Sequence, residues 1–586
     1  GDRHSEAPPL YDLKISGGTV VDGTGADRFV GDVAVKDGVI VHVGPSAPGD
    51  AARTIDATGL VVTPGFVDCH THYDGQVTWD DELNPSAGHG VTTVVMGNCG
   101  VGFAPVHPGS EEWLIQLMEG VEDIPGAALS EGITWGWETF PEYLDVLDQR
   151  RLGIDVGTQV PHGAVRAYVM GERGARNEPA TPEDIEAMGR IVEEAIEAGA
   201  LGVSTSRVLG HRAMDGEQVP GTFAAEDELF GIGRALQRQG RGVFELAPAG
   251  ADGQDLVRAR REVDWMRRLS AEVGAPVTFA MLQVDAEPNL WREIMAESLA
   301  AIDEGARLHP QVAARPFGLL VGFQTHHPFG LRPSYRELAD LAIDERIQFL
   351  RRPAVRSRIL AEDDVEPDRQ LFSGLPALIR MALHKLYILG DPPDYEPTVE
   401  QSVAHLAQRT DTDPLEAVYD ALCEQDGEAL LMLPLFNYTD GDHEAIREQL
   451  LHPTSVSGLS DGGAHCGMIC DASIPTYLLT HWARDRTRGA RLPLEWVVRK
   501  QTRDTAHLFG LTDRGELAVG KKADLNVIDL EGLTLRSPRL VHDLPAGGRR
   551  LLQEAVGYRH TIVSGQETRR DGIDTGARPG RLVRGG

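Results

Sequence analysis

The sequence Gly65-Phe-Val-Asp-Cys-His-Thr-His-Tyr-Asp74 carries two histidines, one residue apart, at the end of an apolar and strand-forming run. Side chains at positions i and i+2 of a strand point to the same face of a sheet. His70 and His72 can therefore offer both imidazoles to one cation, and imidazole nitrogen is a common ligand of Zn²⁺. This segment predicts a metal site at the end of a buried strand.

Strand-like and helix-like segments alternate on either side of these histidines. The expected strands are residues 61–68, 91–97, 154–161, 200–205, 242–247, 276–281, 308–314 and 455–460. The clearest helix begins after the capping residue Thr181, has Pro182 in its first turn and ends at Gly199. Such alternation indicates an α/β fold with a parallel sheet.

Both ends of the chain have a different pattern. Residues 13–25 and 32–44 are short β-branched runs broken by glycine turns, and residues 523–529 and 557–565 repeat that pattern. Glycine turns between such runs are typical of hairpins. The two ends are therefore expected to form one small β-domain around a larger middle.

This arrangement resembles the amidohydrolase superfamily. The resemblance implies a (β/α)8 TIM-type barrel with a small β-sandwich domain built from both termini. The expected domains are residues 1–60 (N-terminal part of the sandwich), 61–510 (barrel, with a helical insertion near 363–441) and 511–586 (C-terminal part of the sandwich).

The carboxyl ends of the expected strands carry further polar residues, and barrels of this type place their chemistry there. Cys99 follows the second strand, His162 the third and Asp461 the eighth, while His465 lies in the loop beyond and has no assigned metal role. Cys99 is either a zinc-binding thiolate or a small buried residue in a glycine-bounded turn. Asp461 can bind metal and accept a proton from water, or serve only as a turn residue beside two glycines.

The segments 90–105, 199–206 and Ser460-Asp-Gly462 make the resemblance specific to the D-aminoacylase branch, the N-acyl-D-amino-acid deacylases. The resemblance implies a zinc centre at His70, His72, Cys99 and Asp461, with Asp461 as catalytic acid and base. That branch normally has histidines at the ends of strands five and six, and both are absent here. Glu245 or His162 could substitute as ligands, and with so few donors one zinc ion is favoured over two.

Lysine usage separates the branches of this superfamily. Hydantoinases, dihydroorotases and ureases bridge two metals with a carboxylated lysine on strand four, but no lysine lies between Lys36 and Lys385. Arginine must then recognise any substrate carboxylate, and its planar guanidinium suits bidentate pairing. The candidates near strand ends are Arg207, Arg212 and Arg315; His211 and the pair His326–His327 are further substrate contacts or loop surface.

Composition limits the partners of the protein. The 89 acidic and 56 basic residues give a formal charge of −33, which argues against nucleic-acid or anionic-membrane partners. Five scattered cysteines do not suggest a disulfide framework. Without an apolar run of about 20 residues or a signal-like start, the expected location is the cytoplasm, and a homo-oligomer is possible.

The reaction expected from these features is hydrolysis of the amide bond of an N-acyl-D-amino acid or related N-acyl compound by metal-activated water. One alternative is a hydrolase of the same fold that acts on a cyclic amide, a carbamate or an amide natural product. A metal-dependent lyase or isomerase is another, and a non-catalytic binding protein is the outside alternative.

Overall fold

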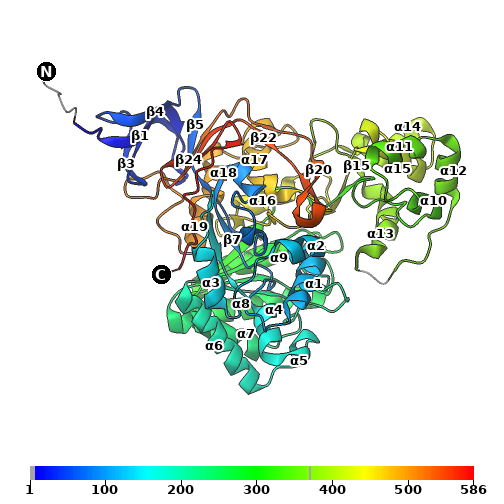
Figure 1. Ribbon diagram of the computed structural model, residues 1–586, viewed down its shortest axis with the longest axis horizontal. Helices are drawn as coiled ribbons and strands as arrows, with labels where there is room; N and C mark the ends of the chain where they lie inside the picture. Colours follow the sequence, from blue (N-terminus) through cyan, green and yellow to red (C-terminus); the bar gives the residue numbers. More distant parts are fainter. Residues whose placement is uncertain (1–6, 369–370, 586) are drawn as a thin grey trace.

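A sheet built from both ends of the chain forms one part of the molecule. In the computed structural model, which describes residues 7–368 and 371–585, this sheet lies at the upper left of Figure 1. Its strand order is β25-β24-β23-β18-β5-β1-β2-β3, with β4 paired to β1. The strands are β1 (Tyr11–Val20), β2 (Phe29–Lys36), β3 (Val39–Gly44), β4 (Ala51–Asp56), β5 (Val61–Pro64), β18 (Leu525–Ile528), β23 (Tyr558–Val563), β24 (Gln566–Arg570) and β25 (Ile573–Asp574).

Parallel strands form the second part, and each of the eight expected strand segments overlaps at least one observed strand. One sheet has the order β6-β7-β8 and the other β17-β13-β12-β11-β10-β9, with every neighbouring pair parallel. The strands are β6 (Phe66–Asp68), β7 (Val91–Met96), β8 (Asp155–Thr158), β9 (Val160–Pro161), β10 (Gly202–Ser206), β11 (Val243–Ala247), β12 (Val277–Met281), β13 (Leu308–Val312) and β17 (Val456–Ser457).

Helices separate these strands along the chain, which makes the fold mixed α/β. They are α1 (Glu111–Glu122), α2 (Gly126–Gly132), α3 (Phe140–Asp148), α4 (His162–Met170), α5 (Glu172–Ala175), α6 (Pro182–Ala198), α7 (Glu226–Gln239), α8 (Leu256–Val273), α9 (Leu290–Ala300), α16 (Glu444–Leu451), α17 (Ile474–Tyr477), α18 (Leu494–Lys500) and α19 (Arg503–Leu508). The prediction for α6 is confirmed, because Thr181 and Asp184 form a capping box and Gly199 ends the helix at φ 119°. Within the described ranges, no helix has both the length and the apolar character needed to span a membrane.

A helical lobe lies at the right of Figure 1 and has its own apolar core, from Leu319 to Leu433. Its elements are β14 (Phe317–Val321), α10 (Pro333–Arg336), α11 (Ile343–Leu350), α12 (Pro353–Ala361), α13 (Leu375–Met381), β15 (Tyr387–Ile388), α14 (Val403–Thr410), α15 (Pro414–Leu422) and β16 (Leu431–Phe436). The insertion expected near 363–441 falls inside this lobe, which also includes β14 and α10–α12. The antiparallel sheet β14-β16-β15 joins its two ends.

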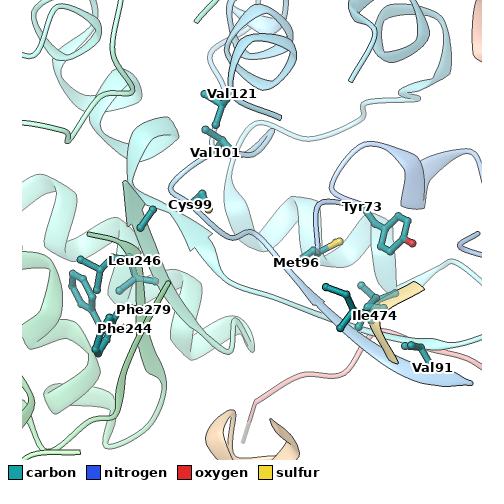
Figure 2. Packing of buried hydrophobic residues seen from close by; sticks show 14 of the residues in the cluster. Tyr73, Val91, Met96, Cys99, Val101, Val121, Phe244, Leu246, Phe279 and Ile474 are labelled. Carbon is teal, nitrogen blue, oxygen red and sulfur yellow. The ribbon is translucent and has the colours of Figure 1, made fainter. Parts of the chain in front are cut away.

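The apolar core of the main body packs on the parallel strands. Figure 2 shows Phe244 and Leu246 of β11 beside Phe279 of β12, and all three side chains are almost completely buried. Every residue of β7 and β11 is buried, as in strands that are covered on both faces, and the polar residues among them are Thr92, Thr93 and Glu245.

Gly65 is the joint between the terminal sheet and the parallel strands. The expected strand 61–68 is divided there, because β5 pairs with β1 and β18 whereas β6 pairs with β7. A Cβ atom on residue 65 would lie 2.0 Å from Oγ1 and 2.4 Å from Cγ2 of Thr92. Only glycine fits this close approach of the two strands.

We therefore expect Gly65→Ala to lower stability by about 1–3 kcal/mol, the usual cost of overpacking a core. Thr92→Ala removes the two nearest atoms, and the buried Thr92 hydroxyl has no hydrogen-bond partner in the described residues. The double variant should therefore unfold at a higher temperature than Gly65→Ala alone. Thermal unfolding of the two single variants and the double variant tests this, and additive losses would contradict the close contact.

Candidate metal centre

Two backbone hydrogen bonds bring the ends of β6 and β17 together. Asp461 donates its amide to the carbonyl of His70 (3.0 Å), and His72 donates its amide to the carbonyl of Gly462 (2.8 Å). Thr71 and Gly462 form a parallel bridge between these bonds. His70, His72 and Asp461 therefore lie side by side although about 390 residues separate them along the chain.

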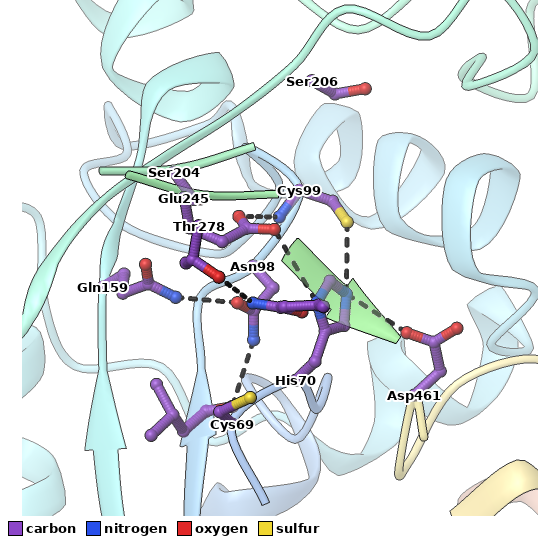
Figure 3. Close-up of polar contacts among 12 residues, drawn as sticks. Cys69, His70, Asn98, Cys99, Gln159, Ser204, Ser206, Glu245, Thr278 and Asp461 are labelled. Carbon is purple, nitrogen blue, oxygen red and sulfur yellow. Dashed lines mark hydrogen bonds and ion pairs between the residues drawn. The ribbon is translucent and has the colours of Figure 1, made fainter. Parts of the chain in front are cut away.

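Figure 3 shows Cys99 and Asp461 pointing at the imidazole of His70. Nε2 of His70 lies 3.2 Å from Oδ1 of Asp461 and 3.4 Å from Sγ of Cys99, and Nε2 of His72 lies 3.3 Å from the same Asp461 oxygen. Ligands about 2.0–2.3 Å from a tetrahedral zinc ion are themselves roughly 3.3–3.6 Å apart. The donor atoms of His70, His72 and Cys99 also lie within 4.8 Å of one another, so the two histidines have the spacing of metal ligands towards Cys99 and towards Asp461.

Gln311 on β13 fixes the orientation of His70, and the sequence analysis did not include it. Nδ1 of His70 lies 2.8 Å from Oε1 of Gln311, whose Nε2 donates to Oγ1 of Thr278 (3.1 Å). Since the Gln311 oxygen must accept, Nδ1 of His70 carries the proton and Nε2 has a free lone pair. A neighbouring acceptor commonly positions a metal-binding histidine in this way.

Buried carboxylates surround the histidines without a lysine or arginine partner. Among the described residues, no lysine or arginine forms an ion pair with Asp68, Asp74, Glu122, Glu245 or Asp461, and each is less than 9% exposed. Buried acidic groups of this kind require neutralisation by protons or by a cation. The donor set fits a divalent metal ion.

Burial is also the main cause of the raised carboxyl pKa values at the centre. Burial raises the pKa of Glu245 to about 8 and that of Asp74 to about 7. Burial also acts to raise the pKa of Asp461, but contacts with His465 and His72 outweigh it and hold that pKa below its usual value. Asp461 is consequently ionised at neutral pH.

Two residues at the centre, Glu122 and His465, were not expected to be donors from the sequence. Glu122 ends α1, and its Oε2 lies 3.3 Å from Nε2 of His72 and 3.6 Å from Nε2 of His465. His465 also lies 3.2 Å from Oδ2 of Asp461. Glu122 follows no strand and belongs to no recognisable motif, whereas the nearness of His465 to Asp461 in sequence was an available signal. The sequence favoured one zinc ion because few donors were identified, and neither Glu122 nor His465 was counted among those donors.

Of the two residues proposed to replace the absent histidines as ligands, Glu245 lies at the centre and His162 does not. Both nitrogens of His162 are bonded away from the centre, to Thr205 (2.8 Å) and Glu228 (2.7 Å). Glu245 is at the centre but on the Nδ1 side of His70, with Oε1 3.7 Å from that nitrogen. Its other oxygen accepts the backbone amide of Cys99 at 3.0 Å, so Glu245 holds the Cys99 loop.

The arginines considered for substrate binding are already bonded. Arg207 forms an ion pair with Glu262 (2.9 Å), and Arg315 forms one with Asp471 (3.0 Å). Arg212 donates to the carbonyl of Gly216 (2.9 Å). His211 is bonded to Ser206 through Nδ1 (2.8 Å), and burial together with the charge of His465 lowers its pKa to about 4. Arg207 therefore has little freedom to bind a substrate carboxylate.

Three residues of the centre adopt left-handed backbone conformations. Cys99 has φ 59°, Asp461 φ 52° and His465 φ 55°. Such conformations cost non-glycine residues about 1–2 kcal/mol each and cluster at functional sites. All three turns direct a potential ligand into the cluster.

A model of the amidohydrolase family matches residues 53–569. The chain belongs to the amidohydrolase family, and within it to the D-aminoacylase branch. It is 27% identical to the D-aminoacylase of Alcaligenes xylosoxydans xylosoxydans over 581 residues, covering 99% of this chain and 98% of that protein. The N-acyl-D-glutamate deacylase of the same organism is 27% identical over 577 residues, covering 98% of this chain and 96% of that protein.

Solved structures show the same fold. A D-aminoacylase crystal structure has a TM-score of 0.65 at 24% identity and covers 98% of this chain and 100% of its own. An N-acyl-D-glutamate deacylase from Bordetella bronchiseptica, complexed with zinc and a phosphonate inhibitor, has a TM-score of 0.64 at 24% identity with the same coverage. The resemblance to the D-aminoacylase branch that the sequence predicted is confirmed.

We expect Cys99→Ser to weaken metal binding, because a hydroxyl is a much poorer ligand than a thiolate. The cobalt(II)-loaded wild-type protein should show a sulfur-to-metal charge-transfer absorption, and the variant should lack it. Cys69→Ser is the matched control, since Cys69 is equally buried but its Sγ contacts the carbonyl of Ser457. A charge-transfer band that survives in Cys99→Ser would mean that Cys99 is no ligand.

Proposed function

We propose that this protein is a zinc-dependent amidohydrolase that cleaves the amide bond of N-acyl-D-amino acids. The observation that carries the proposal is the meeting of His70, His72, Cys99 and Asp461 at donor spacing. Its support from relatives is the similarity, over nearly the whole chain, to proteins named D-aminoacylase and N-acyl-D-glutamate deacylase.

We also propose that the two parallel sheets form one (β/α)8 barrel and that the terminal sheet belongs to a β-sandwich domain. Only Gln159 separates β8 from β9, and the Thr71–Gly462 bridge joins the ends of β6 and β17. Both features support a closed ring of eight strands. The domain boundaries expected near residues 60 and 510 then fall close to Gly65 and after α19.

His70, His72 and Asp461, with Cys99, are the residues that would hold the metal. A bound zinc ion supplies Lewis-acid polarisation of the scissile carbonyl and acidifies water. Gln311 keeps the lone pair of His70 directed at the donor cluster. The buried walls of the centre exclude bulk water, which strengthens every charge interaction inside it.

Asp461 is the proposed general base and acid. Its carboxylate is ionised at neutral pH and has two oxygens, so one can bind metal while the other exchanges a proton. Asp461 takes a proton from the attacking water and returns it to the leaving nitrogen. His465, 3.2 Å from Oδ2, holds the carboxylate in place.

Arg549 is a better candidate than Arg207 for the substrate carboxylate. It lies on β21 (Gly548–Leu552) of the hairpin formed with β20 (Arg539–Leu544), and its guanidinium lies against Gly467, two residues after His465. It is half-buried and donates to the carbonyl of Gln324, yet no described carboxylate forms an ion pair with it. The carboxylate of Asp123 also lies against Gly467, where it accepts the Gly467 amide (2.9 Å) and feels the charge of Arg549, but the two side chains form no ion pair. The guanidinium is therefore still able to bind an anionic substrate group.

Cytoplasmic location and self-association, both expected from the sequence, stay predictions. The proposed substrate is a small molecule, in keeping with the enclosed position of the donor cluster.

Removal of the metal should abolish amide hydrolysis, and added zinc should restore it, because the donors alone cannot polarise a carbonyl. The assay compares N-acetyl-D-amino acids with their L-enantiomers and with a hydantoin, before and after chelation. Turnover of the D-compounds supports the proposal. Hydrolysis of the hydantoin alone would favour the cyclic-amide alternative.

Asp461→Asn should lower kcat by about 10²–10⁴-fold, because the amide keeps the size of the side chain but cannot accept the proton. Metal content and thermal unfolding of the variant, measured beside kcat, separate a lost base from a lost metal. Near-native turnover would assign proton transfer to another residue.

Arg549→Gln should raise KM for N-acyl-D-amino acids by about 10–100-fold, since a hydrogen bond to a charged group contributes about 1.5–3 kcal/mol. The C-terminal amides of the same substrates lack the carboxylate and should be affected little. Arg539→Gln, in the same hairpin but paired with Glu554, is the matched control. An equal effect on acids and amides would contradict carboxylate recognition by Arg549.

A further inference from the structure

The carboxylate of Glu122 is buried without ordinary partners. Glu122 is 2% exposed, and no residue in 7–368 or 371–585 donates a hydrogen bond to its side chain. Its neighbours are the imidazoles of His72 (3.3 Å) and His465 (3.6 Å). A buried carboxylate that faces two imidazoles is arranged as a metal ligand would be.

His72 has the same unusual environment. It is 1% exposed, and neither ring nitrogen makes a hydrogen bond within the described part of the chain. A buried polar group without a partner costs about 1–3 kcal/mol, so such groups usually have an unobserved ion or water. Nε2 of His72 lies 3.3 Å from both Glu122 and Asp461, and these three donor atoms lie within 4.8 Å of one another.

Helix α1 supplies a further reason for a cation here. The helix runs from Glu111 to Glu122, so its negative dipole end and the Glu122 carboxylate coincide. The backbone amide of His465 donates to the carbonyl of Glu122, which ties the loop after β17 to this helix end. Acidic side chains are disfavoured at a helix C-terminus unless a positive charge is bound nearby.

We propose that Glu122 and His465, with His72 and Asp461, form a second metal position beside the cysteine-containing one. Because Nε2 of His72 has a single lone pair, His72 binds the second ion when both positions are filled, and the first ion is then held by His70, Cys99 and Asp461. Two imidazoles and two carboxylates suit divalent ions such as Zn²⁺, Mn²⁺ or Co²⁺. Because this position has no sulfur ligand, it favours harder cations than the cysteine-containing position does. The inference rests on the metal-dependent chemistry proposed above but not on the identity of the substrate. It replaces the expectation of a single ion.

A second cluster in the protein provides a contrast. Glu396, His443 and His481 also bring their donor atoms within 4.8 Å of one another. There, however, both oxygens of Glu396 accept from Arg486 (3.0 Å each), and one also accepts from His481 (2.9 Å). The arginine already neutralises that carboxylate, so we infer an ion-pair network at Glu396 and a metal position at Glu122.

Metal binding without turnover tests the proposal. Wild-type protein, Glu122→Gln and His465→Ala are dialysed against Zn²⁺ or Mn²⁺, and bound metal is measured by elemental analysis and titration. Each substitution should weaken one ion by about 100-fold or more, because even indirect partners of metal ligands contribute about 10–100-fold. Glu112→Gln, exposed on the first turn of α1, and His481→Ala, at the Glu396 cluster, should leave metal binding unchanged.

Anomalous diffraction of the loaded wild-type protein locates the ion directly. A peak about 2.0–2.3 Å from the side chains of Glu122 and His465 supports the proposal. Metal found only beside His70 and Cys99, with affinities unchanged in Glu122→Gln and His465→Ala, overturns it. Neither readout depends on amide hydrolysis, so a failed substrate assay and a failed metal position are distinguishable.

Discussion

The two backbone hydrogen bonds between the ends of β6 and β17 determine the geometry of the centre. They join His70 to Asp461 and His72 to Gly462, and so bring residues from opposite ends of the parallel-strand region into contact. Without this register, Asp461 would not lie 3.2–3.3 Å from both imidazoles. The ligands are therefore positioned by backbone pairing, which is stiffer than a loop, and Gln311 and Glu245 then orient His70 and the Cys99 loop from neighbouring strands.

This geometry has an energetic cost that a bound cation would offset. Cys99, Asp461 and His465 all have positive φ, and each such conformation costs about 1–2 kcal/mol. Carboxylates at Glu122 and Asp461 are buried with histidines as neighbours but with no lysine or arginine partner among the described residues. A protein that concentrates strain and like charge in one place depends on a ligand to stabilise it, so metal binding and folding stability should be coupled.

Sequence reasoning identified the residues that follow strands. His70, His72, Cys99 and Asp461 were found because strand periodicity and strand ends are readable along the chain. Glu122 ends a helix, and Gln311 acts from within a strand on a residue about 240 positions away. Their roles depend on how distant strands close on one another, which local patterns do not encode. Arg207 was chosen for its position near a strand end, but its charge is neutralised by Glu262 on α8.

The contacts of Glu245 and Thr278 explain why strands five and six carry no histidine ligand here. Glu245 on β11 accepts the Cys99 amide, and Thr278 on β12 accepts from Gln311, so these strands now support ligands instead of supplying them. The donors that we propose in compensation, Glu122 and His465, come from the end of α1 and from the loop after β17. The substitution Glu245→His alone would add a possible ligand on strand five, but it would also remove the carboxylate that accepts the Cys99 amide. Such a variant should then bind metal no better than the wild-type protein, and equilibrium dialysis would measure the difference; clearly tighter binding would show that strand five had kept its capacity to supply a ligand.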